Sequence, residues 1–451
     1  MILKQDTISA ISTPQGIGGI AVIRISGEKS IEVVSEFFSG KKDLKFGKSH
    51  SINFGKFVFE NQVIDEVLVS IFRSPNSYTG EDVVEISCHG SSFVVSRILE
   101  ILLLKTRLAD PGEFTQRAFF NNKLDLTQVE AVRDLIESKT EISHRAAIEQ
   151  LEGKLFSRIE KLLKKLTEYR TLLELEIDFL DQDLPEIDVP KLRENLIKLK
   201  TELENLANSG DEGIILREGL KISLVGAPNV GKSSIFNRIL ETERAIVTPI
   251  PGTTRDFLEE AVSIDGYLIR IFDTAGIRTS QNEIEKLGIA RSYEIIRHSD
   301  RVLFIIDKDE NTDEFNKLLN IIDEAKIIKV LNKADIFALK TINKFREKGF
   351  LICSAGEDKG VQELKDHLLN DIRISTEELH SGILTNSRQT AAVKKAVVSL
   401  GKALDSLNME LGFEFTAFDL KEASSNLEEV IGRITSDDIL NNIFENFCVG
   451  K

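Results

Sequence analysis

The chain has 451 residues, which at about 150 residues per domain is enough material for about three domains with separate cores. It carries 58 lysines and arginines against 73 aspartates and glutamates, and the net charge of −15 argues against nucleic-acid binding by bulk positive charge, so any RNA contact must be local or shared with a partner. Cys88, Cys353 and Cys448 stand far apart without a CxxC pair, which argues against a disulfide framework or a zinc site and suggests a reducing compartment.

Residues 1 to about 120 predict a compact α+β domain. The chain begins without the segments of a secretion signal, and no apolar stretch is long enough to span a bilayer, so we expect a cytoplasmic protein without membrane contact. Strand patterns at Thr7–Ser12, Gly19–Ser26, Val63–Phe72 and Val83–Cys88 alternate with helical patterns near Lys29–Phe38 and Phe93–Leu104. The glycines of Gly16-Ile-Gly-Gly19 precede a strand, which favours a hairpin or tight turn over a dinucleotide or KH motif.

Two apolar patterns then predict a pair of long helices. Apolar residues recur in steps of four and three at Leu155, Ile159, Leu162, Leu166, Tyr169 and Leu173, and again at Leu192, Leu196, Leu199, Leu203 and Leu206. The segment Asp181–Pro190 between them is acidic and holds two prolines, which cannot continue a helix. We therefore predict an antiparallel helical hairpin.

A different pattern begins at Leu220 and predicts a doubly wound, mostly parallel sheet. Short apolar runs separated by helices occupy residues 220–225, 268–272, 302–306, 327–331 and 350–353. After about Asn386 the helical pattern returns, at Val393, Val397, Leu400, Leu404 and Leu407 and on through Leu427 and Val430. We predict one helical domain, split in sequence by an inserted α/β domain, with exposed joints at Asn208–Gly213 and Ser375–Ser381.

The first of these strands leads into a phosphate-binding motif. Gly226-Ala-Pro-Asn-Val-Gly-Lys-Ser-Ser234 matches G-x-x-x-x-G-K-[ST], and its glycines allow successive N–H groups and a helix N-terminus to face phosphates. Lys232 adds a point charge and Ser233 offers an oxygen to Mg²⁺. We predict that the nucleotide contacts Asn229, Val230, Gly231, Lys232, Ser233 and Ser234; a chance match in a glycine-rich turn is the alternative.

Three further segments at strand ends indicate that the nucleotide is GTP. Asp273-Thr274-Ala275-Gly276 can hold Mg²⁺ through water and meet the γ-phosphate with a backbone N–H group. In Asn332-Lys333-Ala334-Asp335 the Asp335 carboxylate can accept two hydrogens from the N1 and N2 edge of guanine, a pair of donors that adenine lacks. Ser354-Ala355 can line the other edge of the base.

These motifs resemble the GTPase superfamily, and the whole chain resembles the MnmE/TrmE family of tRNA-modifying GTPases. Outside the GTPase motifs the resemblance rests on Ser77-Tyr-Thr-Gly-Glu81-Asp-Val-Val-Glu85, on the stretch Pro111–Leu126 and on the terminal Cys448-Val-Gly-Lys451, where the family usually has isoleucine instead of Val449. It implies a tetrahydrofolate-binding-like α+β domain at residues 1–120, a discontinuous all-α helical domain at 121–215 and 377–451, and an inserted α/β P-loop GTPase domain at 216–376.

The resemblance also implies two metal ions in the GTPase site. Thr254 joins Ser233 as a ligand of Mg²⁺, and K⁺ is held by the Asn229 side chain and by the backbone at Thr248, Ile250 and Thr253; Thr248, Thr253 and Thr254 also border the nucleotide. A monovalent cation beside the phosphates offsets charge where other GTPases use an arginine finger. Asn229 could instead be a loop residue that bonds its own backbone.

The residue that positions the attacking water is also given by the resemblance. Ile277 stands where Ras-like proteins carry a glutamine, and isoleucine cannot orient water. Glu285 matches the family glutamate that performs this task once two GTPase domains meet. From charge pattern alone, Glu283 and Glu285 are more simply solvated switch residues.

For the N-terminal domain, the resemblance implies a constitutive homodimer and a site for a one-carbon folate, 5-formyl- or 5,10-methylene-tetrahydrofolate. The expected folate residues are Arg24, Glu81, Lys123 and Lys451, which by themselves are ordinary surface charges. A cysteine at the position of Cys448 is required for the modification in the family. As a thiolate it would be favoured by the neighbouring Lys451, and otherwise it is a buried or frayed thiol.

Together these expectations describe a K⁺-stimulated GTPase that acts with an FAD-dependent, MnmG/GidA-like partner, as a heterotetramer. The pair installs an aminomethyl-type group at C5 of the wobble uridine of certain tRNAs. The main alternative is a ribosome-assembly GTPase, but the sequence shows no KH or aromatic RNA-platform signature, and such a protein has no use for Cys448. A scaffold stabilised by nucleotide is a third possibility.

Overall fold

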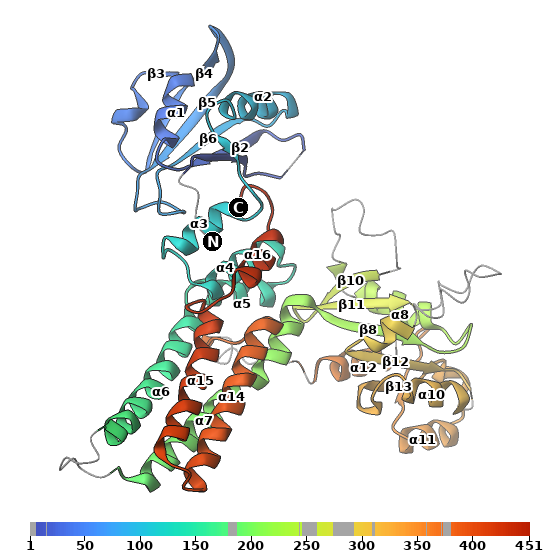
Figure 1. Ribbon diagram of the computed structural model, residues 1–451. Helices are drawn as coiled ribbons and strands as arrows, with labels where there is room; N and C mark the ends of the chain where they lie inside the picture. The colour runs from blue at the N-terminus through green and yellow to red at the C-terminus, as the bar shows by residue number, and fades with distance from the viewer. Residues whose placement is uncertain are drawn as a thin grey trace, which may run out of the picture. The chain divides into compact units, whose positions relative to one another are not determined.

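The computed structural model describes residues 6–14, 16–178, 187–242, 244–245, 259–273, 293–308, 312–357, 359–370, 372 and 380–451. The chain divides into two compact units, one of residues 1–133, 150–193 and 398–451 and one of residues 134–149 and 194–397 (Figure 1). Four helices contribute residues to both units: α4 (Leu126–Glu137), α5 (Glu141–Leu151), α7 (Val189–Glu218) and α14 (Ser387–Asn408). Within the described ranges no helix is both long and apolar enough to cross a membrane.

The first unit is built around a seven-stranded sheet in the order β3-β4-β5-β6-β2-β1-β7. Its strands are β1 (Ile8–Ile11), β2 (Ile20–Ser26), β3 (Phe38–Gly40), β4 (Ser51–Phe59), β5 (Gln62–Phe72), β6 (Val83–His89) and β7 (Arg107–Leu108). Neighbours are antiparallel except for β1 and β7. The α+β expectation is confirmed, and Gly16–Gly19 lie in the connection of the β1–β2 hairpin. The sequence patterns missed β4, although it is nine residues long.

Side chains of β2 point alternately to the two faces of this sheet, an apolar core face and a polar face. Ile23 and Ile25 are buried in one cluster with helices α1 (Ser30–Phe37) and α2 (Ser92–Leu102), which cover that face in Figure 1. Successive side chains of a strand point to opposite faces, so Arg24 and Ser26 lie on the other side of the sheet.

Helix α3 (Glu113–Phe120) lies on that second face. Its Phe114 packs with Ile8 and Ala10 of β1 in a small buried cluster. The polar side chains of β2 therefore do not meet open solvent but a covering helix.

Long helices complete the first unit. Helix α6 (Lys154–Asp178) packs along α15 (Phe413–Ile431), and five of its six predicted apolar residues are fully buried, whereas Tyr169 is half-buried. Helix α16 (Asp437–Glu445) joins Leu126, Val129 and Phe447 in one apolar cluster. This cluster anchors the end of the chain within the first unit.

The second unit carries the predicted, mostly parallel sheet, in the order β14-β13-β12-β8-β11-β10-β9. Its strands are β8 (Leu220–Val225), β9 (Arg244–Ala245), β10 (Glu259–Ile264), β11 (Tyr267–Asp273), β12 (Arg301–Ile306), β13 (Ile327–Leu331) and β14 (Leu351–Ile352). Strand β10 is antiparallel to β11, whereas β8, β11, β12, β13 and β14 pair in parallel. Helices α8 (Lys232–Thr242), α10 (Thr312–Leu319), α11 (Leu339–Glu347) and α12 (Val361–Leu369) accompany these strands.

One predicted joint is wrong, because Asn208–Gly213 lies inside α7. A Cβ atom at Gly210 would come within 2.3 Å of Thr390 Oγ1, and one at Gly213 within 1.9 Å of Leu384 O. Glycine is therefore needed at these positions because a neighbouring segment packs closely against the helix. In composition, such a stretch of helix resembles a linker. Most of the other predicted joint, Ser375–Ser381, lies outside the described residues, as does most of the turn predicted at Asp181–Pro190.

Candidate functional site

The phosphate loop lies between β8 and α8, where the sequence places it. Gly226 and Gly231 have positive φ angles of +152° and +93°. A Cβ at Gly226 would come within 2.1 Å of Ile305 O, and one at Gly231 within 2.2 Å of Asn332 Nδ2. Only glycine fits these two positions, because both the backbone angles and the space exclude a side chain.

Lys232, Ser233 and Ser234 supply polar groups beside the curved backbone of the phosphate loop. Lys232 is 6% exposed, and its Nζ donates to Gly226 O at 2.8 Å and to Ala227 O at 2.9 Å. Its ammonium group is thus held over the loop where phosphates would lie. Ser233 and Ser234 are exposed in the first turn of α8, while Val230 is buried in the core and fixes the loop from below.

Asn229 adopts the left-handed conformation, with φ of +62°. Asparagine is among the residues that tolerate this region. The backbone conformation alone therefore explains an asparagine at this position, without any ligand. Its carbonyl accepts from Lys333 Nζ at 2.7 Å.

The Asn332-Lys-Ala-Asp335 motif at the end of β13 is joined directly to the phosphate loop. Asn332 is 1% exposed, and its Nδ2 donates to Val230 O at 2.9 Å. Lys333 also donates to Asp307 Oδ2 at 2.5 Å. Two predicted motifs that are 100 residues apart in the chain therefore form one rigid corner, as parallel strands ending at one sheet edge require.

The predicted base-recognition residues meet at the same corner. Ser354 Oγ donates to Asp335 Oδ1 at 2.5 Å, so the two predicted segments are in direct contact. Ala355 N donates to Asn332 Oδ1 at 3.3 Å, and Arg238 Nε donates to Ala355 O at 3.1 Å. The Asp335 carboxylate is thereby held in one orientation by a neighbouring hydroxyl.

Several predicted residues lie outside the described part of the chain: Thr248, Ile250, Thr253, Thr254, Thr274, Ala275, Gly276, Ile277 and Glu285. Asp273 ends β11 in register with Leu224 of β8, which places its backbone beside the strand that enters the phosphate loop. Among the described residues no cluster of three or more His, Cys, Asp or Glu side chains is arranged to hold a metal ion.

A second polar site lies on the α3-covered face of the first unit's sheet. Arg24 of β2 is paired in register with Glu85 of β6, and its Nε and Nη2 each lie 2.9 Å from Glu85 Oε1. The guanidinium carbon is 5.2 Å from the ring centre of Tyr78 and 5.7 Å from that of Phe114. Arg24 is thus fixed by one carboxylate and two aromatic rings.

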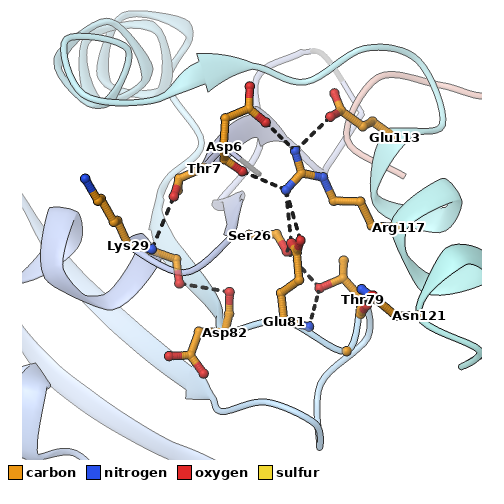
Figure 2. Close-up of polar contacts among 12 residues, drawn as sticks. Asp6, Thr7, Ser26, Lys29, Thr79, Glu81, Asp82, Glu113, Arg117 and Asn121 are labelled. Atoms are coloured by element: carbon orange, nitrogen blue, oxygen red, sulfur yellow. Dashed lines mark hydrogen bonds and ion pairs between the residues drawn. The ribbon is translucent and has the colours of Figure 1, made fainter. Parts of the chain in front are cut away.

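Glu81 occupies the same face and is held by a buried cation. Arg117 of α3 is 1% exposed, and its Nη1 lies 3.2 Å and 3.1 Å from the two Glu81 carboxylate oxygens. Ser26 Oγ donates to Glu81 Oε2 at 2.7 Å. Figure 2 shows Glu81 between Arg117 on one side and Ser26 with Thr79 on the other.

Two more carboxylates complete the surroundings of Arg117. Its Nη2 donates to Asp6 Oδ1 at 2.7 Å and to Glu113 Oε1 at 2.9 Å (Figure 2). A hydrogen bond from Arg107 holds the pKa of Asp6 below its usual value. Burial opposes ionisation of Glu113, yet hydrogen bonds from Arg107 and from the Asp110 backbone keep its pKa low as well. Asp6 and Glu113 are therefore ionised at neutral pH.

Lys123 packs over the loop that carries Glu81. Its Nζ donates to Pro75 O at 3.1 Å, and a Cβ at Gly80 would lie 3.3 Å from Lys123 Cγ. Asn121 Nδ2 donates to Thr79 O at 2.7 Å, which ties the same loop to the end of α3. The ammonium group of Lys123 is therefore near this face but occupied by a carbonyl.

The end of the chain is clasped to β1. Gly450 has φ of +96°, and a Cβ there would come within 2.1 Å of Ile11 O. Ser12 Oγ donates to Gly450 O at 2.9 Å. Lys451 lies close enough to Arg24 of the polar face for their charges to interact, and burial together with this repulsion lowers the pKa of Lys451. Cys448 is exposed.

The structure therefore gathers the expected folate residues on one sheet face, with Lys123 at its margin. It adds residues that the sequence analysis did not identify: Ser26, Tyr78, Glu85, Phe114 and Arg117. Ser26 could have been found, because it lies two positions from Arg24 in a strand and shares its face. Arg117 lies in the stretch Pro111–Leu126 that carries the family resemblance, but nothing in the sequence marks it as buried, since an arginine in a helix is usually exposed.

Comparison with known proteins gives matches along nearly the whole chain. A family model described as the MnmE helical domain matches residues 126–448, and one described as the GTP-binding protein TrmE N-terminus matches residues 7–123. The tRNA modification GTPase MnmE of Acetivibrio thermocellus is 41% identical over 461 residues, covering 99% of this chain and 100% of the relative. That of Clostridioides difficile is 42% identical over 456 residues, covering 99% of each. Among solved structures, the G domain of the T. maritima FeoB iron transporter is similar with a TM-score of 0.27 and 26% identity, over 34% of this chain and 99% of that chain.

Proposed function

This chain belongs to the MnmE family of tRNA modification GTPases, and we propose from that premise which reaction its GTP hydrolysis serves. Together with an FAD-dependent, MnmG/GidA-like partner, it installs an aminomethyl or carboxymethylaminomethyl group at C5 of the wobble uridine of certain tRNAs. The assembly is a cytoplasmic heterotetramer built on a homodimer of this chain. Flavin chemistry belongs to the partner, because this sequence has no flavin fingerprint.

The guanine selectivity of the site rests on Asp335. Ser354 Oγ occupies one side of Oδ1 at 2.5 Å, which fixes the plane of the carboxylate before nucleotide binds. A preoriented carboxylate accepts the two donors of guanine without losing further side-chain entropy. Asn332 and Lys333 brace this corner against the phosphate loop, so base binding and phosphate binding share one rigid element.

We place both ions, Mg²⁺ and K⁺, at the phosphate loop. Ser233 is exposed at the start of α8 and fits Mg²⁺, with Thr254 as the second protein ligand. Asn229 lies exposed at the loop and fits K⁺, with the backbone at Thr248, Ile250 and Thr253. K⁺ supplies positive charge at the phosphates when bound, and Glu285 orients the attacking water once two GTPase domains pair.

The polar face of the first unit binds a one-carbon tetrahydrofolate, in the 5-formyl or 5,10-methylene form. Glu81 accepts from the amino-pyrimidine edge of the pterin, while Arg24, Lys123 and Lys451 bind the folate carboxylates. The bound folate supplies the one-carbon unit. Arg117 and Ser26 hold the Glu81 carboxylate in the orientation for this contact.

The observation that best supports the modification role is the clasp between Gly450 and β1. It brings Lys451 beside Arg24 and keeps the exposed thiol of Cys448 near the polar face instead of on a loose tail. A chain that only hydrolysed GTP would not need its last four residues on another functional surface. Cys448 therefore takes part in the modification or in its geometry.

The test is nucleoside mass spectrometry of tRNA from cells that lack this protein. The C5-modified wobble uridine should disappear and return on expression of the wild-type chain. Cys448→Ser should fail to restore it while the purified variant still hydrolyses GTP, and Val449→Ala, at the neighbouring exposed position, should restore it. Unchanged wobble uridine in the deletion strain would contradict the proposed function.

A further inference from the structure

A short loop between β3 and β4 carries a local excess of positive charge on the first unit. Residues 41–50, here called the basic loop, contain Lys41, Lys42, Lys45 and Lys48 and a single acid, Asp43. Four lysines against one aspartate give a net charge of +3 in a chain whose total is −15. All four lysines are exposed.

The basic loop also exposes an aromatic ring. Phe46 is 88% exposed, the most exposed phenylalanine in the described part of the chain. Burial of such a side chain would stabilise the fold by about 2 kcal/mol. The exposed position of Phe46 among lysines therefore does not contribute to folding. An aromatic face with cations around it is the arrangement that binds an unpaired base and its phosphates.

The backbone under Phe46 is rigid, so the exposure is not that of a loose loop. Leu44 is 1% exposed and belongs to the core of the sheet. Asp43 Oδ1 accepts from Lys45 N at 2.9 Å and caps the short helical turn Leu44–Phe46, which uses the one acidic side chain locally. Arg73 binds the loop from below, donating to Lys45 O at 2.7 Å and to Gly47 O at 3.1 Å.

A depression of about 380 Å³ opens beside these side chains. Lys42, Lys45 and Ser39 line it together with two acids, of which Glu36 is ion-paired with Lys105 and Asp43 caps the turn Leu44–Phe46. Ser35 Oγ also lines it and has no hydrogen-bond partner among the described residues. The depression therefore offers hydroxyl and ammonium donors, and each of its two carboxylates is engaged by a neighbouring group.

We propose that the basic loop is the surface through which this chain contacts tRNA, with Phe46 stacking on an unpaired base and Lys42, Lys45 and Lys48 binding the adjacent phosphates. The inference rests on the proposed function, because it names the contact surface for the same substrate. An acidic chain needs such a local surface, since its overall field repels a polyanion. The exposed ring favours RNA over the acidic surface of a second copy of this chain, because an unpaired base can stack on Phe46 while the adjacent phosphates bind the lysines.

The lysines are tested by tRNA binding of the full-length protein at several KCl concentrations. The triple variant Lys42→Ala, Lys45→Ala, Lys48→Ala should bind tRNA at least about tenfold more weakly, with the slope of log K against log salt reduced by about two to three. The matched control Lys161→Ala, Lys164→Ala, Lys165→Ala changes the net charge equally on helix α6 and should stay within about twofold of the wild type.

The aromatic ring is tested with RNA hairpins that differ only in unpaired bases. Phe46→Ala should weaken binding of a hairpin with an unpaired loop about tenfold and leave a blunt duplex unaffected, while Phe46→Trp should retain binding. Phe418→Ala is the control, because Phe418 is 68% exposed but has the acidic neighbours Asp419 and Glu422. Unaltered GTP turnover and circular dichroism show that the variants are folded.

Each outcome decides the proposal. The proposal is overturned if the basic-loop variants bind tRNA as tightly as the wild type. It is also overturned if only the α6 control loses binding, or if the wild-type chain binds no tRNA. Variants that change the sedimentation of the protein instead of its tRNA affinity would assign the surface to a second copy. The proposed function fails separately, through unchanged nucleosides in the deletion strain.

Discussion

Arg117 donates from a single nitrogen, Nη1, to both carboxylate oxygens of Glu81, at 3.2 Å and 3.1 Å. The arginine is 1% exposed and the glutamate side chain 26% exposed, so a buried cation holds a carboxylate that still reaches solvent. A carboxylate restrained in this way has its free oxygen lone pairs directed outward before a ligand arrives. The two residues are 36 positions apart in the chain, on a helix and a loop.

Arg117→Met should destabilise the first unit by about 3–5 kcal/mol, because it leaves Asp6, Glu81 and Glu113 buried or half-buried without their shared cation. Native-state hydrogen exchange of the amides of β1 and β6 measures this loss locally. Arg107→Met is the control, since Arg107 binds two of the same carboxylates from a more exposed position and should cost less. Equal protection factors in Arg117→Met and the wild type would contradict a structural role for the pair.

The same cluster predicts how stability depends on pH. The pKa values of Asp6 and Glu113 are lowered in the folded chain, so their contribution is fully present above the unfolded values of about 4 and is lost as the pH falls through the lower, folded values. The unit should therefore lose stability below about pH 4, as thermal unfolding at graded pH would record. Arg107→Met should flatten this dependence, because the Arg107 hydrogen bonds are the main cause that lowers both pKa values, and a slope as steep as that of the wild type would refute the assignment.

Gly450→Ala should abolish tRNA modification while GTP turnover stays normal. The added Cβ would meet Ile11 O at 2.1 Å at a backbone angle of +96°, so the tail must leave β1 and carry Lys451 away from Arg24. The measurements are nucleoside mass spectrometry of complemented cells and phosphate release by the purified protein. Ser12→Ala removes only the hydroxyl that binds Gly450 and should give a partial defect. Full modification by Gly450→Ala would mean that the clasp is dispensable.

Asp335→Asn should lose about 3 kcal/mol of GTP affinity, roughly 100-fold, and gain affinity for xanthosine triphosphate, because the amide turns one acceptor into a donor. Ser354→Ala should cost about 1 kcal/mol for GTP without changing the preferred base, since it removes only the hydroxyl that orients Asp335. Titration calorimetry with both nucleotides measures each change. Retained GTP preference in Asp335→Asn would remove this carboxylate from base recognition.

Replacing K⁺ by the smaller Na⁺ should slow hydrolysis and weaken pairing of GTPase domains with GDP and aluminium fluoride. We propose two roles for Asn229, in binding K⁺ and in the left-handed backbone, and a pair of variants separates them: Asn229→Ala removes the amide and strains the backbone at φ of +62°, whereas Asn229→Gly removes the amide alone. Both should lose the K⁺ response if the side chain binds the ion. Glu285→Ala should keep K⁺-dependent pairing yet raise the barrier by about 2–4 kcal/mol. Wild-type K⁺ stimulation in Asn229→Gly would leave Asn229 only its conformational role.

Local patterns were sufficient for much of the fold. The run Leu220–Val225 is strand β8 and the run Ile327–Leu331 is strand β13, because short apolar stretches between helices are buried in a parallel sheet. Strand β10, next to the edge strand β9, was missed, since its sequence Glu-Glu-Ala-Val-Ser-Ile contains no such run. The stretch Asn208–Gly213 was mistaken for a joint, because glycines that admit a close neighbour and glycines of a linker are alike in sequence.

The sequence by itself determined the motifs whose chemistry depends on neighbours in the chain: the phosphate loop of Gly226–Ser234, the guanine motif of Asn332–Asp335 and the family to which they belong. Only the tertiary structure decided that Arg117 is buried beneath Glu81, that Gly450 touches Ile11, and that Phe46 stands exposed among lysines. Backbone conformation and periodicity are set over a few residues. Burial, charge pairing and close approach are set by residues that are tens to hundreds of positions away, and a single sequence does not record which of them meet.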